Sequence, residues 1–124
     1  MKEINILVID DEEMIRENIC TFLEDEGINC FAASDENEAF AQLEANPYID
    51  VAIVDMRLSG GDGNELILKM NSFRSKLKFI VHTGSQEYSL PKELCDIGVE
   101  EESVFKKPIL DMGRIVDQIK KVCS

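Results

Sequence analysis

Apolar and polar positions follow two alternating patterns along the chain, which together predict five strand–helix units. Short, nearly unbroken apolar runs predict strands at residues 4–9, 28–33, 51–54, 77–81 and 103–106. Runs of this kind are typical of strands that are covered on both faces. After each strand, apolar residues recur three and four positions apart, which indicates an amphipathic helix.

The helical pattern covers residues 12–26, residues 35–47, a third segment marked by Leu66 to Phe73, residues 89–97, and a last segment after Pro108. Gly27 is a C-cap candidate for the first helix, and Asp35 with Glu38 is a capping pair at the start of the second. The fourth helix is predicted to be short. Five such units indicate an α/β fold, a doubly wound five-stranded parallel sheet with five helices on both faces.

Bulk composition fits one domain that spans residues 1–124. Hydrophobic residues make up 44% of the chain and charged residues 31%, which suits a soluble domain with one core. There is neither an apolar stretch of about 18 residues nor a signal-peptide pattern, so we expect a cytoplasmic protein. The net charge of −12 argues against binding to nucleic acids and to anionic membranes.

The cysteines and the single histidine are scattered. Cys20, Cys30, Cys95 and Cys123 form no C-x-x-C pair, and His82 has no ligand-spaced partner, so no zinc site is predicted. For a cytoplasmic protein we expect reduced thiols. We interpret Cys20 and Cys30 as small core residues.

Polar residues that could take part in binding or catalysis follow four of the predicted strands: Asp10 and Asp11, Asp55, Thr83 and Lys107. In a doubly wound sheet, ligands bind beyond the carboxyl ends of the strands, so these residues should converge. Three neighbouring carboxylates repel one another unless a cation lies among them. Hard oxygen ligands favour Mg²⁺, and the lysine and hydroxyl suit a phosphoryl group.

This chemistry assigns a role to each residue. Asp55 is the nucleophile and forms an acyl phosphate, while the metal and Lys107 neutralise charge on the transferring group. The Thr83 hydroxyl binds a phosphoryl oxygen. A single aspartate after a strand is usually a turn residue, and only the combination favours function. In contrast, Lys106 is interpreted as a solvated strand-end charge and His82 as a packed or partly exposed strand residue.

Four short motifs carry a family resemblance over the whole chain: Leu7-Val8-Ile9-Asp10-Asp11-Glu12, Val54-Asp55-Met56-Arg57-Leu58 with Asp62-Gly63, Thr83-Gly84, and Lys106-Lys107-Pro108. The set resembles the receiver domain of bacterial two-component response regulators, in a stand-alone form similar to the chemotaxis regulators. The resemblance implies strand order 2-1-3-4-5, the arrangement that the chemotaxis regulator illustrates. It also implies Mg²⁺ bound directly by Asp11, through water by Asp10, by Asp55, and by the backbone carbonyl of Arg57.

The resemblance implies partners as well. A histidine kinase or a phosphotransfer protein would supply the phosphoryl group. A downstream protein would bind the face formed by the fourth helix, the fifth strand and the fifth helix. We expect a monomer, with a phosphorylation-dependent dimer as the alternative, and no enzymatic turnover beyond self-phosphorylation and self-dephosphorylation.

The chain departs from the family pattern in the loop after Asp55, where Ser59 replaces a proline, and before the lysine, where Val104 replaces Tyr or Phe. Phe105 does not substitute for that aromatic residue, because adjacent strand residues face opposite ways. Valine has little reach and one stiff torsion. We therefore expect backbone motion of residues 83–88 to carry more of the response.

Two other functions fit the same fold. One is an adaptor that works without phosphorylation, although an intact set of Asp11, Asp55, Thr83 and Lys107 argues against it. The other is an aspartate-nucleophile phosphatase. Such enzymes carry a second aspartate two residues after the nucleophile, where this chain has Arg57.

Overall fold

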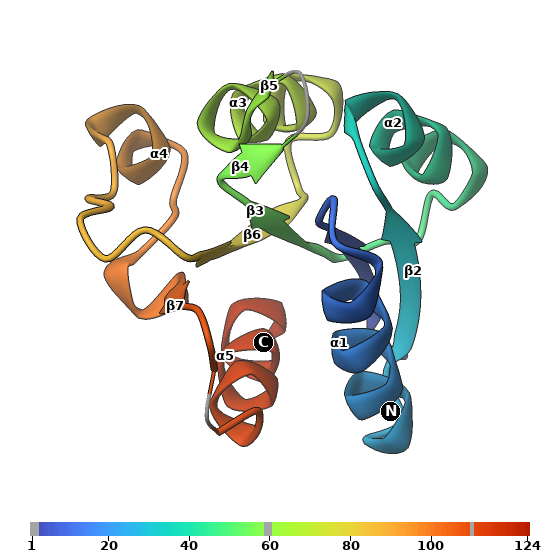
Figure 1. Cartoon of the computed structure of the whole chain (residues 1–124). Coiled ribbons are helices and arrows are strands. Elements are labelled where there is room, and N and C mark those ends of the chain that lie inside the picture. The colour runs from blue at the N-terminus through green and yellow to red at the C-terminus, as the bar shows by residue number, and fades with distance from the viewer. Residues whose placement is uncertain (1–2, 59–60, 110) are drawn as a thin grey trace.

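The computed structural model describes residues 3–58, 61–109 and 111–124, and its elements alternate as the pattern predicts (Figure 1). The strands are β1 (Asn5–Ile9), β2 (Asn29–Ala33), β3 (Val51–Asp55), β4 (Arg57–Leu58), β5 (Gly61–Asp62), β6 (Lys78–Thr83) and β7 (Val104–Lys106). The helices are α1 (Glu13–Asp25), α2 (Glu36–Ala45), α3 (Gly63–Phe73), α4 (Lys92–Asp96) and α5 (Gly113–Cys123), with a 3₁₀ turn at Glu101–Ser103.

The central sheet has five parallel strands in the order β2-β1-β3-β6-β7, which confirms the predicted doubly wound topology. Helices α1 and α5 cover one face of the sheet, and α2, α3 and α4 cover the other (Figure 1). Strands β4 and β5 form a separate antiparallel pair before α3. This pair lies in the loop after Asp55, of which Ser59 and Gly60 lie outside the described residues.

The core consists of two apolar clusters, one on each face of the sheet. Alternate residues of a strand point to opposite faces, so Ile6 and Val8 join the cluster under α1 and α5 while Leu7 and Ile9 join the other. The same alternation separates Val104 from Phe105, as predicted, because they pack into different clusters. Strand β3 is buried throughout, and β1 and β6 are buried after their first residues. This burial holds the carboxyl ends of the three strands at one edge.

The predicted helix ends are largely confirmed. Gly27 follows α1 with φ 81°, a left-handed conformation that glycine adopts without strain. The Asp35 side chain accepts a hydrogen bond from the amide of Glu38 (2.8 Å) and caps α2. Helix α4 is short, as predicted, whereas α5 begins only at Gly113, well after Pro108.

The prediction for the Cys20 and Cys30 thiols is wrong. The structure joins them in a disulfide between α1 and β2, with their Cα atoms 5.4 Å apart, a separation in the usual range for such a bridge. Both residues do pack against the cluster under α1 and α5. The pairing depends on how α1 lies against β2, and sequence spacing alone does not reveal that.

Within the described ranges of the chain, no helix has the length and apolar character needed to cross a membrane.

Candidate functional site

The candidate site lies at the carboxyl edge of the sheet, where the strand order places β1, β3, β6 and β7 next to one another. Asp10 follows β1, Asp55 ends β3, Thr83 ends β6, and Lys107 follows β7. Asp55 thus lies on the central strand, and Asp10 lies at the end of the strand beside it. Residues separated by up to 97 positions therefore meet at one edge.

The three predicted acidic residues form a cluster. One carboxylate oxygen each from Asp10, Asp11 and Asp55 lies within 4.8 Å of the other two. Asp10 and Asp55 are buried, and Asp11 is exposed. Such a set of hard oxygen atoms, open to water on the Asp11 side, fits Mg²⁺, which keeps several water ligands when it binds proteins.

Lys107 lies between the two buried carboxylates. Its ammonium is 2.9 Å from Asp10 Oδ2 and 3.3 Å from Asp55 Oδ2. A single ammonium beside a cluster of three carboxylates leaves an excess of negative charge at the site. That excess favours a bound cation.

Asp55 is a poorly solvated carboxylate, with 4% of its surface exposed. Burial is the main reason that the pKa of Asp55 is raised above its ordinary value, and the charge of Asp10 adds to it. The amide of Arg57, which donates to Asp55 Oδ1 (3.2 Å), and the Lys107 ammonium oppose this shift. The surroundings of Asp55 therefore disfavour its negative charge, and a cation that neutralises this charge would bind favourably.

Lys107 shows the opposite balance. Burial alone would lower the pKa of Lys107, but the hydrogen bond and charge of Asp10, together with the charge of Asp55, outweigh burial and raise it. The ammonium is thus held in its charged form at the site.

Asp10 is fixed on several sides. Its Oδ1 accepts a hydrogen bond from the amide of Glu12 (2.9 Å), and its carbonyl accepts one from Arg16 Nη1 (2.7 Å). With Lys107 on Oδ2, the side chain has little freedom to rotate. The predicted ligand role of the Arg57 carbonyl stays a prediction.

Thr83 is fully buried, and its hydroxyl accepts a hydrogen bond from the amide of Ser85 (3.1 Å). Its carbonyl accepts one from the amide of Lys107 (2.7 Å). In the sheet register the partner of Asp55 is His82, so Thr83 lies one residue beyond Asp55 on the neighbouring strand. The hydroxyl is thus near the edge but bound to the segment that follows it.

The start of α3 approaches Asp55 closely. A Cβ atom at Gly63 would overlap the carbonyl oxygen of Asp55 and lie 2.7 Å from Met56 Cα. Asp62 caps α3, because its side chain accepts a hydrogen bond from the amide of Asn64 (2.8 Å). The absence of a side chain at Gly63 therefore lets the helix begin directly beside the candidate nucleophile.

The prediction that Lys106 is a solvated strand-end charge is wrong. The residue is half-buried, and its ammonium donates hydrogen bonds to the carbonyls of Ser85 (2.9 Å), Tyr88 (3.0 Å) and Gln86 (3.4 Å). Backbone carbonyls have no sequence signature, so no pattern could have revealed these partners.

His82 is packed in β6, as predicted. Within the described residues, neither ring nitrogen of His82 has a hydrogen-bond partner. Burial, with a smaller effect of the Lys107 charge, lowers the pKa of His82 to about 4. The ring is therefore neutral near pH 7.

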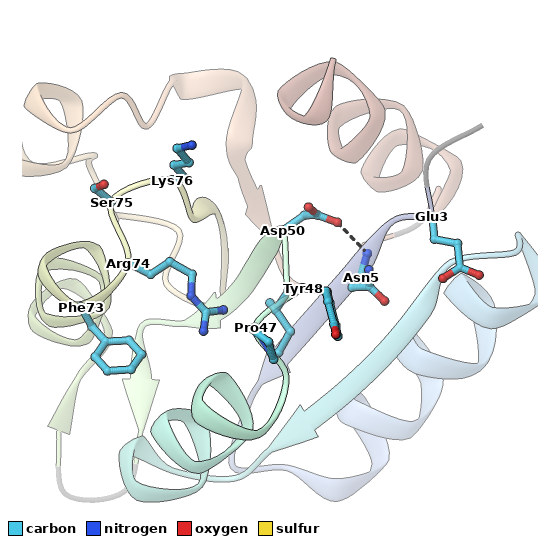
Figure 2. Close-up of a pocket in the computed structure, with 10 residues that line it drawn as sticks. Glu3, Asn5, Pro47, Tyr48, Asp50, Phe73, Arg74, Ser75 and Lys76 are labelled. Atoms are coloured by element: carbon cyan, nitrogen blue, oxygen red, sulfur yellow. Dashed lines mark hydrogen bonds between the residues drawn. The ribbon is translucent and has the colours of Figure 1, made fainter.

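An open pocket of about 920 Å³ lies at the other end of the sheet (Figure 2). It is bordered by Asn5, which begins β1, by Asp50, which precedes β3, and by the exposed aromatic side chains of Tyr48 and Phe73. None of the predicted site residues lines it. The pocket and the acidic cluster are therefore separate features at opposite ends of the strands.

The known proteins that this chain resembles in sequence point to the same family. Residues 6–120 match the sequence profile of the response regulator receiver domain. Sporulation initiation phosphotransferase F of Bacillus subtilis is 28% identical over 116 residues, which are 94% of this chain and 90% of that protein. Transcriptional regulatory protein FixJ of Azorhizobium caulinodans is 30% identical over 110 residues, 87% of this chain. The chain spans 50% of FixJ and 30% of the response regulator RR06 of Streptococcus pneumoniae.

Solved structures show the same fold. A response regulator receiver protein from Pseudomonas putida superimposes with a TM-score of 0.84 at 27% identity, covering 98% of each chain. The complex of CheX and CheY with BeF₃ and Mg²⁺ from Borrelia burgdorferi gives 0.82 at 22% identity, covering 98% of this chain and 90% of that one.

Proposed function

Since this chain belongs to the family of response regulator receiver domains, we propose that Asp55 accepts a phosphoryl group in a Mg²⁺-dependent reaction. The observation that carries the proposal is the set of groups around the buried carboxylate of Asp55. Asp55 is 4% exposed, lies 3.3 Å from the Lys107 ammonium, and shares a 4.8 Å cluster with Asp10 and Asp11. This arrangement combines a nucleophile, a fixed cation and a set of oxygen ligands for a divalent ion.

In the proposed reaction a carboxylate oxygen of Asp55 attacks the phosphorus atom of the donor. A new P–O bond forms, and the bond from phosphorus to the donor breaks, with its electron pair leaving on the donor. The product is an acyl phosphate on Asp55. Asp10, Asp11 and Asp55 would hold Mg²⁺, with the carbonyl of Arg57 as a further proposed ligand. When bound, Mg²⁺ supplies positive charge against the phosphoryl oxygens.

Two residues of the site act on the incoming group. Lys107 already faces the Asp55 carboxylate, so it is placed to bind a phosphoryl oxygen and neutralise its charge. The Thr83 hydroxyl accepts a hydrogen bond from the amide of Ser85, and a hydroxyl also has one hydrogen to donate. It would donate that hydrogen to a phosphoryl oxygen.

The donor in this proposal is a histidine kinase or a phosphotransfer protein in the cytoplasm. The output is binding of a downstream protein at the face formed by α4, β7 and α5. The name of the Bacillus subtilis relative, a phosphotransferase of which the chain covers 90%, also supports onward transfer in a relay. The Borrelia burgdorferi CheX–CheY complex shows that a protein of this fold binds another protein.

Catalytic turnover of external substrates is not part of the proposal. At the position where an aspartate-nucleophile phosphatase needs a second acid, this chain has Arg57, with an exposed side chain. The site residues Asp11, Asp55, Thr83 and Lys107 are all present, which favours a phosphorylated switch over an adaptor that ignores phosphorylation.

The proposal is tested by incubating the chain with acetyl phosphate and Mg²⁺. We expect one phosphoryl group per chain, lost on treatment with hydroxylamine because acyl phosphates react with that nucleophile. Asp55→Asn should abolish labelling, whereas the matched variant Asp25→Asn, at an exposed position near the end of α1, should label normally. A hydroxylamine-stable label, or one located on His82, would contradict the assignment.

A further inference from the structure

The segment between β6 and α4 is held by side chains from two other elements. Lys106 is the register partner of Thr83 on the adjacent strand, so it stands beside the start of this segment. Its ammonium donates to the carbonyls of Ser85, Gln86 and Tyr88 at 2.9, 3.4 and 3.0 Å. An ammonium has three hydrogens to donate, and these three carbonyls account for them. Lys106 thereby fixes the backbone of the segment onto β7.

Tyr88 ties the same segment to α3. Its hydroxyl donates to Asn64 Oδ1 (2.8 Å), and the Lys106 ammonium lies 5.5 Å from the centre of its ring. Burial, with a smaller effect of Asp62, raises the pKa of Tyr88 to about 12, so the hydroxyl keeps its hydrogen near pH 7. The amide of Asn64 is bound by Asp62 in the cap of α3. The anchor is therefore at the fixed start of a helix.

The held segment is attached directly to the Thr83 hydroxyl. That hydroxyl accepts from the amide of Ser85, the first of the three residues whose carbonyls Lys106 binds. These contacts occur together with an ion pair of 3.3 Å between the Lys107 ammonium and Asp55 Oδ2, the arrangement expected while the carboxylate itself carries the charge. Movement of Thr83 toward a phosphoryl group would pull on Ser85 and so on the contacts of Lys106 and Tyr88.

We propose that Lys106, Tyr88 and Asn64 form a latch that positions Thr83 for the unmodified state and opposes its movement toward phosphorylated Asp55. The three are positioning residues, since none of them is placed to touch the phosphoryl group. The inference rests on the proposed phosphorylation of Asp55. It gives this chain an aromatic residue coupled to the site from the β6–α4 segment, while β7 carries Val104 at the position where the family often has one.

The test measures how tightly the chain binds beryllium fluoride with Mg²⁺, a mimic of the phosphoryl group. Binding is followed by the amide resonances of residues 83–88. Tyr88→Phe removes only the hydroxyl and keeps the ring. If the latch opposes the bound state, Tyr88→Phe should lower the beryllium fluoride concentration that half-saturates the chain roughly fivefold. This factor corresponds to one net hydrogen bond. Asn64→Ala should give the same shift, and the double variant should give no more than either.

Two further measurements separate a latch from a merely stabilising contact. In a Thr83→Ala background, Tyr88→Phe should no longer change the affinity, because the latch acts through that hydroxyl. Lys106→Gln should also tighten binding. The matched controls Tyr48→Phe, 75% exposed, and Lys78→Gln, at an exposed position, should leave it unchanged.

Melting temperatures of all variants are measured in parallel to verify folding. Unchanged or weaker binding by Tyr88→Phe, or the same shift with Thr83→Ala, overturns the latch. If the wild-type chain binds the mimic and the variants bind it with the same affinity, the latch alone is rejected. A wild-type chain that neither binds the mimic nor takes label on Asp55 rejects the proposed function and the latch with it.

Discussion

The surroundings of Asp55 change the ionisation of this one carboxylate and its effect on stability. The carboxylate is almost fully removed from water. The Arg57 amide and Lys107 compensate its charge in part, while Asp10 adds a repulsive charge. Its pKa is consequently raised, mainly by burial. An isolated buried charge is expensive, so the ionised nucleophile reduces the stability of the fold until a cation or a phosphoryl group binds there.

This cost predicts a pH-dependent effect of Asp55→Asn in the absence of Mg²⁺. A carboxyl group whose pKa is higher in the folded state stabilises the fold most below its unfolded pKa, roughly 3.9, and loses this contribution as pH rises through the folded value. Asn cannot ionise and keeps an oxygen for the Arg57 amide. Asp55→Asn should therefore raise the melting temperature at pH 7, and the advantage should shrink toward pH 4.

Chelator is present throughout, so that bound metal does not obscure the result. The exposed change Asp25→Asn serves as the control and should show a much smaller dependence on pH. A melting temperature of Asp55→Asn that falls below that of the wild-type chain at pH 7 would show that the Lys107 ion pair outweighs the cost of burial.

Among the elements, α3 packs very closely against the end of β3. It begins at Gly63, against the backbone of Asp55 and Met56, and its cap residue Asp62 also belongs to the β4–β5 pair. The amide of Gly63 donates to the carbonyl of Met56 (3.2 Å), which fixes the helix start to the end of β3. The geometry of the nucleophile and the placement of α3 are therefore coupled.

Gly63→Ala should disturb both. The added methyl group would meet backbone atoms of Asp55 and Met56, which cannot move aside as a flexible side chain could. We expect a loss of about 1–3 kcal/mol in the free energy of unfolding, the range for overpacking a filled interior. Chemical denaturation measures this loss, and acetyl phosphate labelling of the folded variant should be slower. Gly61→Ala is the matched control, because nothing lies within 4 Å of its added Cβ atom.

If Gly63→Ala is as stable as Gly61→Ala and labels at the same rate, the close approach of α3 has no bearing on the site.

For the molecule as a whole, charge is the dominant feature. The chain carries a net charge of −12, and its fold concentrates three carboxylates at one edge of the sheet. Neither the cluster nor the ion pairs with Lys107 survive unfolding, because the residues come from distant parts of the chain. A cation that binds this cluster should therefore bind the folded state and stabilise it.

Mg²⁺ should thus raise the melting temperature. Binding to the folded state alone adds about 2.7 kcal/mol when free Mg²⁺ exceeds the dissociation constant about a hundredfold. Asp11→Asn should reduce the rise, while Asp25→Asn should retain it. NaCl at equal ionic strength distinguishes specific binding from screening of the acidic surface. A melting temperature that responds equally to both salts would argue against the metal site.

Much of the fold follows from local patterns in the chain. The apolar runs are long enough and regular enough to specify buried parallel strands, and the caps at Asp35 and Gly27 depend only on neighbouring residues. The candidate site could also be predicted, since a strand's last residue must lie at the carboxyl edge of a parallel sheet. Hence the positions of Asp10, Asp55, Thr83 and Lys107 in the chain are enough to predict that they lie at that edge.

Other features depend on tertiary structure. The carbonyl partners of Lys106 carry no side-chain signal, the Tyr88–Asn64 hydrogen bond joins different elements, and the Cys20–Cys30 pairing requires α1 to lie against β2. The sequence determines which residues are apolar, charged or flexible, and therefore the elements and the edge at which they meet. Packing alone decides which side chains come within hydrogen-bonding distance, because that depends on helix placement to within an ångström or so, far finer than any periodicity specifies.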